Sequence, residues 1–143
     1  MKKGLVGSLA FDAGVVLELL YSTPHGSKLK EAIKNESVYG NISELCVAEV
    51  GYVLCRKLGG EEARVRIRNL LDSGYFLVHE DSELIEHATE YKCKRRLSLA
   101  DCFTLALAKK MDAPALFAKR EAELIKEISR EPFDVEILFL EDF

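Results

Sequence analysis

The sequence lacks the features of membrane-spanning, secreted and disordered chains. None of its apolar runs approaches the roughly 20 residues of a membrane span, and residues 5–11 are too short and too poorly flanked for a secretory signal. It has only three prolines and no tract rich in proline, glycine or serine. With 48% hydrophobic residues, the chain is expected to be a globular cytoplasmic protein that crosses no membrane.

Closely paired cysteines are also missing. The four cysteines contain no C-x-x-C pair, which argues against a zinc site of the usual spacing. Each lies among apolar residues in a helical pattern, so we interpret all four as reduced core residues. A zinc site assembled from distant cysteines and histidines is the alternative. The four are Cys46, Cys55, Cys93 and Cys102.

An excess of positive charge is absent, because the formal net charge is -4. Proteins that bind nucleic acid without regard to sequence are normally strongly basic, so this balance argues against that class. Two local clusters could still form a phosphate-contacting rim around an acidic centre, or they could be solvated helix faces. They consist of Arg64, Arg66 and Arg68, and of Lys92, Lys94, Arg95 and Arg96.

Short apolar runs alternate with helical patterns along the chain. Strands are predicted over residues 5–11, 38–42, 75–78, 114–118 and 135–140, and helices over 15–20, 27–35, 43–58, 61–73, 81–96, 98–111 and from 121. This alternation predicts an α/β fold with a mostly parallel central sheet of about four or five strands and helices on both faces. The length of 143 residues predicts a single domain over residues 1–143.

Four acidic residues stand where such a fold places ligands. Asp12 and Glu121 follow predicted strands, and the ligand crevice of a parallel sheet lies beyond the carboxyl ends of its strands. Asp101 opens an alanine-rich helix. Glu49 lies on an apolar helical stripe, where an unpaired charge would cost several kcal/mol, so it needs a cation, a hydrogen-bond network or a raised pKa.

Each acid taken alone also has a structural explanation. The alternatives are an N-cap at Asp12, an ion pair of Glu49 with Arg56 or Lys57, a capping box from Ser98 to Asp101, and favourable first-turn charge at Glu121 and Glu123. Their joint placement favours a shared site, because converging carboxylates repel one another unless a divalent cation neutralises them. Oxygen ligands of this kind favour magnesium or manganese.

Four segments in order along the chain resemble the PIN-domain family, in particular the VapC-type toxin ribonucleases of VapBC toxin-antitoxin pairs. They are residues 9–17, 43–50, 97–106 and 115–124, and each contains one of the four acids. The segment 97–106, with the sequence LSLADCFTLA, is the most specific. Together the four segments extend over nearly the whole chain.

The resemblance implies a PIN-like fold and a metal-dependent endoribonuclease that uses Mg²⁺ or Mn²⁺ to hydrolyse RNA. In that scheme Asp12 and Asp101 are the main metal ligands, Glu49 binds metal directly or through water, and Glu121 completes the cage or orients the nucleophile. The resemblance further implies a homodimer and a small antitoxin partner. A PIN nuclease in housekeeping RNA processing is an alternative role.

Two departures from the family pattern are visible. Gly14 stands where the family often has Ser, Thr or Asn, and Lys119, Arg120 and Glu121 replace the usual Thr-x-Asp. Glu123 is therefore a second candidate for the fourth acid. These departures leave open a non-catalytic PIN-like module that binds RNA or a protein.

A phosphoacceptor or phosphatase would also place an Asp after its first strand. Such sites need a second acid beside the first or two residues after it. Here those positions hold Ala13 and Gly14, which argues against this class.

Overall fold

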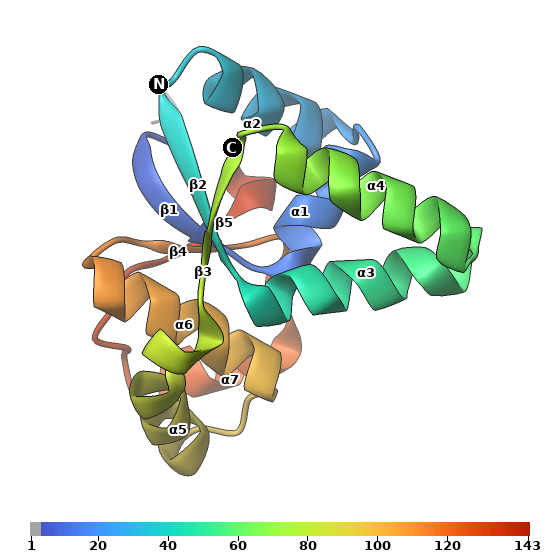
Figure 1. Cartoon of the computed structure of the whole chain (residues 1–143). Coiled ribbons are helices and arrows are strands. Elements are labelled where there is room, and N and C mark those ends of the chain that lie inside the picture. The colour runs from blue at the N-terminus through green and yellow to red at the C-terminus, as the bar shows by residue number, and fades with distance from the viewer. Residues whose placement is uncertain (1–3) are drawn as a thin grey trace.

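Five parallel strands form the centre of the molecule, in the order β3-β2-β1-β4-β5 (Figure 1). This computed structural model describes residues 4–143. The predicted α/β fold is confirmed, and every strand pairing is parallel. The strands are β1 (Gly7–Phe11), β2 (Val38–Ser43), β3 (Phe76–His79), β4 (Ala115–Phe117) and β5 (Ile137–Phe139).

Over residues 4–143, seven α-helices and two short 3-10 turns connect and follow the strands. Within residues 4–143, no helix has both the length and the apolar character needed to cross a membrane. The helices are α1 (Ala13–Leu20), α2 (Pro24–Lys34), α3 (Glu44–Leu58), α4 (Gly60–Asp72), α5 (Ile85–Lys94), α6 (Leu99–Met111) and α7 (Ala122–Arg130), and the turns are η1 (Asp81–Glu83) and η2 (Leu140–Asp142).

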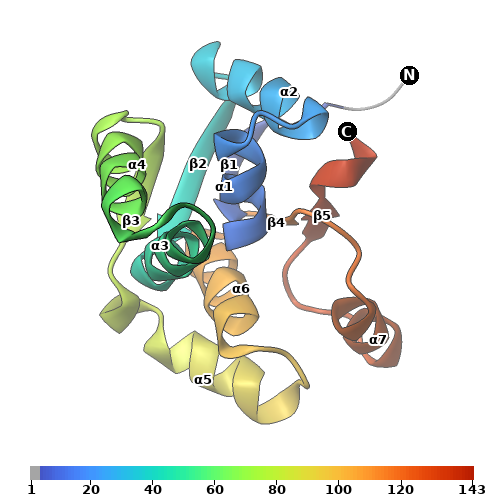
Figure 2. The ribbon, with the colours of Figure 1, turned by 90° about the vertical axis from the view of Figure 1, so that its right-hand side faces the viewer.

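The helices cover both faces of the sheet, as predicted. Helices α1 to α4 pack on one face together with Leu9 and Phe11, and α5 to α7 pack on the other face together with Ala10 (Figures 1 and 2). Successive residues of β1 thus enter opposite cores, because side chains alternate across a strand. Each core contains apolar side chains from at least two strands, so the sheet is buried on both faces.

Polar caps fix where the principal helices begin. Asp12, Thr23, Ser43 and Ser98 each adopt an extended backbone and accept a hydrogen bond from an amide of the helix that follows. Such caps satisfy amides that have no partner inside the helix. The caps of α1, α3 and α6 therefore place Asp12, Glu49 and Asp101 at or near the start of three helices.

The predicted helix over 81–96 is wrong at both ends. Asp81 does not open this helix, because its carboxylate accepts from the Leu45 amide at 3.0 Å while its own amide donates to Glu44. Residues 81–83 form η1 instead, and α5 begins at Ile85. At the other end Arg95 is already extended, so α5 stops at Lys94.

The prediction that all four cysteines lie in the core is also wrong. Cys46 and Cys102 are buried, but Cys55 and Cys93 are exposed, and all four are free thiols. On α3 the buried stripe is Cys46, Val50 and Leu54. Cys55 follows this stripe by one residue, which turns its side chain by about 100° away from the core.

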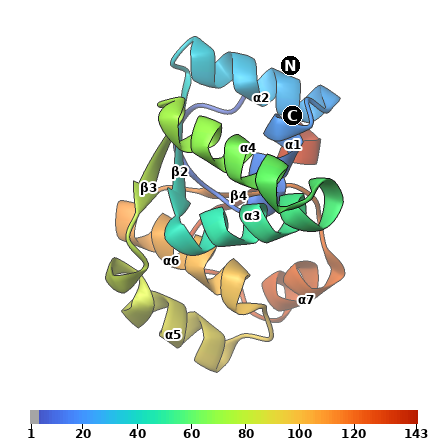
Figure 3. The same ribbon diagram turned by 45° about the vertical axis from the view of Figure 1, so that its right-hand side comes forward.

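The strand order creates a crevice between β1 and β4. The chain moves from β1 outwards to β2 and β3, and then returns to place β4 on the other side of β1. Ligands of open parallel sheets bind at such a switch point, beyond the carboxyl ends of the strands. Figure 3 shows α3 lying between α1 and α6. Asp12 follows β1 directly, and residues 118–121 follow β4.

Gly26 allows α2 to pack against the end of α1, and replacing it tests this arrangement. A Cβ atom on Gly26 would lie 2.0 Å from the backbone oxygen of Glu18, whereas one on Gly51 would meet only Ile67, at 3.9 Å. We expect Gly26→Ala to lower the free energy of unfolding by at least ~2 kcal/mol, as overpacking does. Gly51→Ala should raise it by up to ~1 kcal/mol, because alanine favours helix. Urea unfolding measures both, and equal effects would contradict the packing described.

Candidate active site

A cavity of about 260 Å³ lies at the switch point, beyond β1 and β4. Three of the predicted acids, Asp12, Asp101 and Glu121, line it, together with Glu123 and Lys119. They come from three elements that are far apart in the sequence: the start of α1, the start of α6 and the start of α7. The structure therefore brings together the parts of the chain that the sequence pattern singled out.

Asp12 occupies the most constrained position at this cavity. Its Oδ1 accepts from the Val15 amide at 3.1 Å, so the predicted N-cap is present. Burial, together with the charges of Asp101, Glu49 and Glu121, raises the pKa of Asp12 to about 7 against the lowering effect of the Val15 amide. Capping and membership of an acidic site thus apply to the same carboxyl group.

Asp101 is half-buried in the first turn of α6. Its amide donates to Ser98 Oγ at 3.1 Å, which forms the first half of the predicted capping box. Burial raises the pKa of the Asp101 carboxyl despite a hydrogen bond from Ser98, and Glu121 and then Glu123 add to the rise. Asp101 therefore feels the negative charge of both acids near the start of α7.

Glu49 lies on α3, which packs against both α1 and α6. The predicted ion pair with Arg56 or Lys57 is absent, because these cations lie over the rings of Tyr52, at 5.0 Å, and Tyr21, at 4.8 Å. Burial raises the pKa of Glu49, and the charges of Asp101 and Glu121 raise it further. Although Glu49 does not line the cavity, it belongs to the same electrostatic group.

Glu121 and Glu123 can be distinguished by the groups that they affect. Both are exposed and line the cavity. The charge of Glu121 raises the pKa of Asp12, Glu49 and Asp101, whereas that of Glu123 contributes only at Asp101. Glu121 stands at the N-cap position of α7 but makes no capping bond with its side chain. The geometry thus favours Glu121 as the fourth member.

The four carboxylates do not form a ready-made metal cage. Among residues 4–143, no group of three or more Asp, Glu, His or Cys side chains is close enough to hold a metal ion as it stands. The donor set nevertheless fits a hard divalent cation, because it consists of carboxylate oxygens alone. Their mutual repulsion is a cost that such a cation would remove. Asp12 and Asp101, with Glu121 and Glu49 around them, are the residues that could hold it.

The basic residues that replace the Thr-x-Asp pattern have separate roles. Arg120 turns away to ion pairs with Glu141 and Asp142 of η2, and its guanidinium lies 4.9 Å from the centre of the Phe139 ring. Lys119 lines the cavity, and among residues 4–143 it is the only cationic side chain that does so. A lysine beside acidic groups can contact a substrate phosphate.

The predicted basic rim over residues 92–96 is only partly available. Arg95 is buried against Glu127, with 8% of its side chain exposed. Lys92 donates to the Leu97 carbonyl, and Lys94 pairs with Glu90. On α4, Arg66 pairs with Glu62 and all three arginines lie toward solvent. Arg95 is therefore excluded as a phosphate contact.

Gly14 lies where α1 approaches the end of β4. A Cβ atom at this position would be 3.1 Å from Ala118 Cβ and 3.4 Å from Asp12 Oδ2. A Ser, Thr or Asn here would place its side chain against the Asp12 carboxylate, but Ala118 would have to move by a few tenths of an ångström. The departure at Gly14 thus accompanies a close approach between two elements of the site.

Sequence analysis missed the far wall of the cavity. Leu17, Glu18 and Tyr21 line it beside Gly14, and Thr23 closes it by donating a hydrogen bond to Glu18. A helical signal was present, since positions 14, 17, 18 and 21 recur on one face of a helix. The wall is mostly uncharged, so the cavity has an acidic end and a more apolar end.

The model of the PIN domain family matches residues 9–132, a range that includes all four acids. The chain therefore belongs to the PIN domain family. No protein with a curated description matches the chain.

Several solved structures share the fold at low sequence identity. A toxin-antitoxin complex from Klebsiella pneumoniae is 16% identical, with a TM-score of 0.62 over 94% of this chain and 98% of that chain. VapBC-1 from nontypeable Haemophilus influenzae is 12% identical, with a TM-score of 0.64 over 94% and 99%. VapC20 from Mycobacterium tuberculosis, described as a toxin that cleaves the sarcin-ricin loop, is 17% identical, with a TM-score of 0.60 over 76% and 87%.

The raised pKa of Asp12 predicts how stability varies with pH when no divalent cation is present. The pKa of the Asp12 carboxyl is about 7 in the fold, against an ordinary value of 3.8, so the folded chain holds this proton more tightly than the unfolded chain. Protonated Asp12 therefore stabilises the fold at low pH, and this contribution is lost as the pH rises from the lower pKa to the higher one. With EDTA present, the free energy of unfolding should fall by about 1–2 kcal/mol between pH ~5.5 and pH ~8.

The matched variant for this measurement is Asp12→Asn, which keeps the helix cap but does not titrate. Urea unfolding of the variant should show a flatter pH dependence than that of the wild type. Other titrating groups are common to both proteins and cancel in the difference. The same pH dependence in both would contradict the assignment of a raised pKa to Asp12.

Proposed function

We propose that this protein is a metal-dependent endoribonuclease that hydrolyses RNA phosphodiester bonds as the toxin of a toxin-antitoxin pair. The observation that carries the proposal is the acidic group at the switch point. Asp12, Glu49, Asp101 and Glu121 come from four helix segments of a PIN-domain chain, around one cavity or beside it, and the charges of Asp101 and Glu121 raise the pKa values of both Asp12 and Glu49.

Each residue has a role in this scheme. Asp12 and Asp101 would hold Mg²⁺ or Mn²⁺, Glu49 would bind it directly or through water, and Glu121 would complete the site or orient the attacking water. When bound, such an ion activates water for in-line attack and offsets the charge that develops on the phosphate. Lys119 contacts a phosphate of the RNA strand beside the acids.

The structural neighbours support the toxin role and suggest the partners. The complexes from Klebsiella pneumoniae and Haemophilus influenzae share the fold over more than nine-tenths of this chain, and the first is described as a toxin-antitoxin complex. By analogy, we propose that a small antitoxin protein binds this chain and blocks the cavity. A homodimer belongs to the same proposal.

Removing one carboxylate charge tests the catalytic assignment. Asp101→Asn should reduce cleavage of single-stranded RNA by more than about 100-fold, beyond the loss typical of residues that act only through a metal ligand. Its Ser98 cap uses the backbone amide, so the fold should remain intact. The assay follows RNA cleavage with Mg²⁺ or Mn²⁺, together with the melting temperature, which either ion should raise in the wild type.

Asp112→Asn is the control, because Asp112 is exposed at the other end of α6 in a left-handed conformation that Asn also favours. It should cleave RNA at the wild-type rate. Unchanged cleavage by folded Asp101→Asn would remove Asp101 from the site. A wild type that binds metal and RNA but never cuts would instead favour a non-catalytic module, an alternative suggested by Gly14 and the missing Thr-x-Asp.

The fourth acid is identified by comparing two neighbouring variants. Glu121→Gln should lower cleavage at least about tenfold, because the charge of Glu121 acts on the three other acids. Glu123→Gln should lower it less than about threefold, since its charge acts only at Asp101. Initial rates at saturating Mg²⁺ measure both, and the reverse ranking would assign the role to Glu123.

A further inference from the structure

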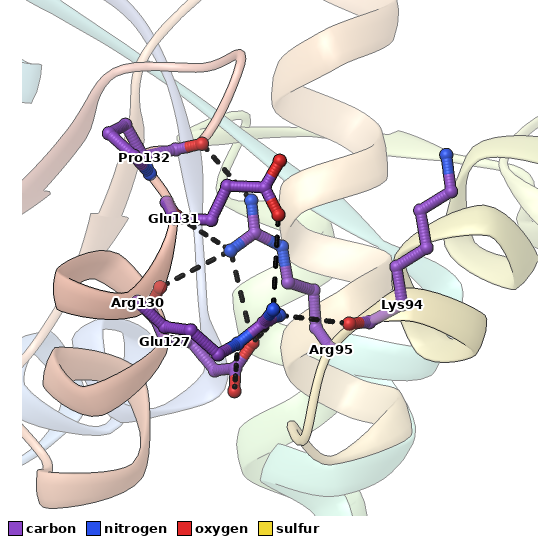
Figure 4. A network of polar contacts seen from close by, with 6 residues as sticks. All are labelled: Lys94, Arg95, Glu127, Arg130, Glu131 and Pro132. Atoms are coloured by element: carbon purple, nitrogen blue, oxygen red, sulfur yellow. Dashed lines mark hydrogen bonds and ion pairs between the residues drawn. The ribbon is translucent and has the colours of Figure 1, made fainter.

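A partly buried ionic cluster fastens α7 to the segment that precedes α6 (Figure 4). The side chains of Arg95 and Glu127 are 8% and 6% exposed, and their charged atoms lie 3.8 Å apart. Arg130 contacts the same carboxylate at 2.8 Å and donates to the Lys94 carbonyl at 3.0 Å. We call Arg95, Glu127 and Arg130 the clamp.

Arg95 makes its hydrogen bonds to carbonyls in and just after the last turn of α7. Its guanidinium donates to the carbonyls of Glu127, Glu131 and Pro132, at 3.2, 2.6 and 3.1 Å. The Glu127 carbonyl also accepts from the Glu131 amide at 3.1 Å, and carbonyls at a helix C-terminus carry partial negative charge. The guanidinium also lies 3.8 Å from the centre of the Phe133 ring. Arg95 thus caps α7 although it belongs to another part of the chain.

The clamp lies between two elements that carry site acids. Arg95 precedes Asp101 by six positions, with the Ser98 cap between them, and Glu127 follows Glu121 by six positions. Since α7 has nine residues, it is a short rigid helix about 13 Å long. A contact that fixes the C-terminal half of this helix therefore also sets the position of Glu121 at its start.

Apolar packing also holds α7: Leu124 is buried, and Ile125 and Ile128 pack against the core on the α6 side of the sheet. Glu121 and Glu123 at its start are exposed. On the other side of Glu121, Arg120 is bound to η2. Glu121 is thus held from both sides, and the clamp supplies an ion pair and hydrogen bonds between α7 and the segment that leads to Asp101.

We propose that Arg95 and Glu127 are positioning residues that hold the first turn of α7 beside the first turn of α6, and so keep Glu121 and Asp101 within reach of one cation. This inference rests on the proposed function for its metal. Neither residue lines the cavity, so their effect on the cation passes through Asp101 and Glu121. Partners that orient metal ligands in this way typically alter metal affinity by about 10- to 100-fold.

The principal test is Arg95→Met, measured in two ways. Mn²⁺ affinity should weaken by about 10- to 100-fold, as determined by electron paramagnetic resonance of free Mn²⁺ on folded protein. Hydrogen exchange, followed by mass spectrometry, should accelerate over residues 121–126 but not over α3. Arg95→Lys keeps the charge but loses the forked donors, so it should restore only part of the affinity.

A second variant guards against a simple failure to fold. Removing one partner of a buried pair is strongly destabilising, whereas replacing both by apolar side chains of similar volume is often neutral. The double variant Arg95→Met with Glu127→Met should therefore fold with a melting temperature near that of the wild type. It should still bind Mn²⁺ about tenfold more weakly, because the directional bonds to the α7 carbonyls are gone.

Two controls separate positioning from general stability. Lys110→Met breaks the ion pair with Glu83 at the far end of α6, and Leu70→Ala removes buried side chain from α4. The first should leave Mn²⁺ affinity unchanged. The second should lower the melting temperature and raise exchange across the whole fold, again with unchanged affinity.

The outcomes distinguish the clamp from the proposed function. Wild-type Mn²⁺ affinity in the folded clamp variants, or an equal loss of affinity in Leu70→Ala, overturns the positioning role while the nuclease assignment stands. If the wild type itself binds no Mn²⁺, the proposed function fails. In that case hydrogen exchange over residues 121–126 tests the positioning role of the clamp. Faster exchange in the clamp variants alone supports this role, and unchanged exchange overturns it.

Discussion

Repulsion between carboxylates is the constraint on which the site depends. The pKa values of Asp12, Glu49 and Asp101 are raised by burial and by negative charges that include that of Glu121 at the start of α7, and without other contacts these acids would separate. The fold holds each one by a contact that does not involve the others. Asp12 is held by its amide cap, Asp101 by Ser98, Glu49 by the packing of α3, and Glu121 by the clamp and Arg120. The acidic group is thus held in place by interactions with neutral and oppositely charged groups elsewhere.

Much of the fold could be predicted because its signals are local. The alternation of short apolar runs with helical patterns predicted all five strands to within two residues at each end, and the polar caps marked where α1, α3 and α6 begin. The errors arose where a side chain bonds to a distant part of the chain instead of its own helix. Asp81 was predicted to open a helix, but its carboxylate accepts a hydrogen bond from the Leu45 amide, 36 positions away in the sequence.

The site was predictable to the extent that family motifs fix its residues. Asp12, Glu49 and Asp101 lie in segments that match the PIN pattern, and capping accounts for two of them without removing them from the site. The sequence narrowed the fourth acid only to Glu121 or Glu123, because the position of Glu121 depends on contacts made by Arg95 and Arg120. The prediction that Arg95 could contact phosphate was wrong for the same reason. A run of basic residues does not show that one of them donates to a carbonyl 32 positions later in the chain.

The four cysteine thiols differ in reactivity according to where they lie in the fold. Cys46 lies near Asp12 and Glu49, and burial with their negative charge raises its pKa, while burial raises the pKa of Cys102, next to Asp101, to about 11. Both are therefore poor nucleophiles beside the acids. Cys55 on α3 and Cys93 on α5 are exposed on opposite layers of the sheet. Alkylating reagents would modify this outer pair first, so that native cysteines could carry two probes across the sheet and leave the acidic crevice untouched.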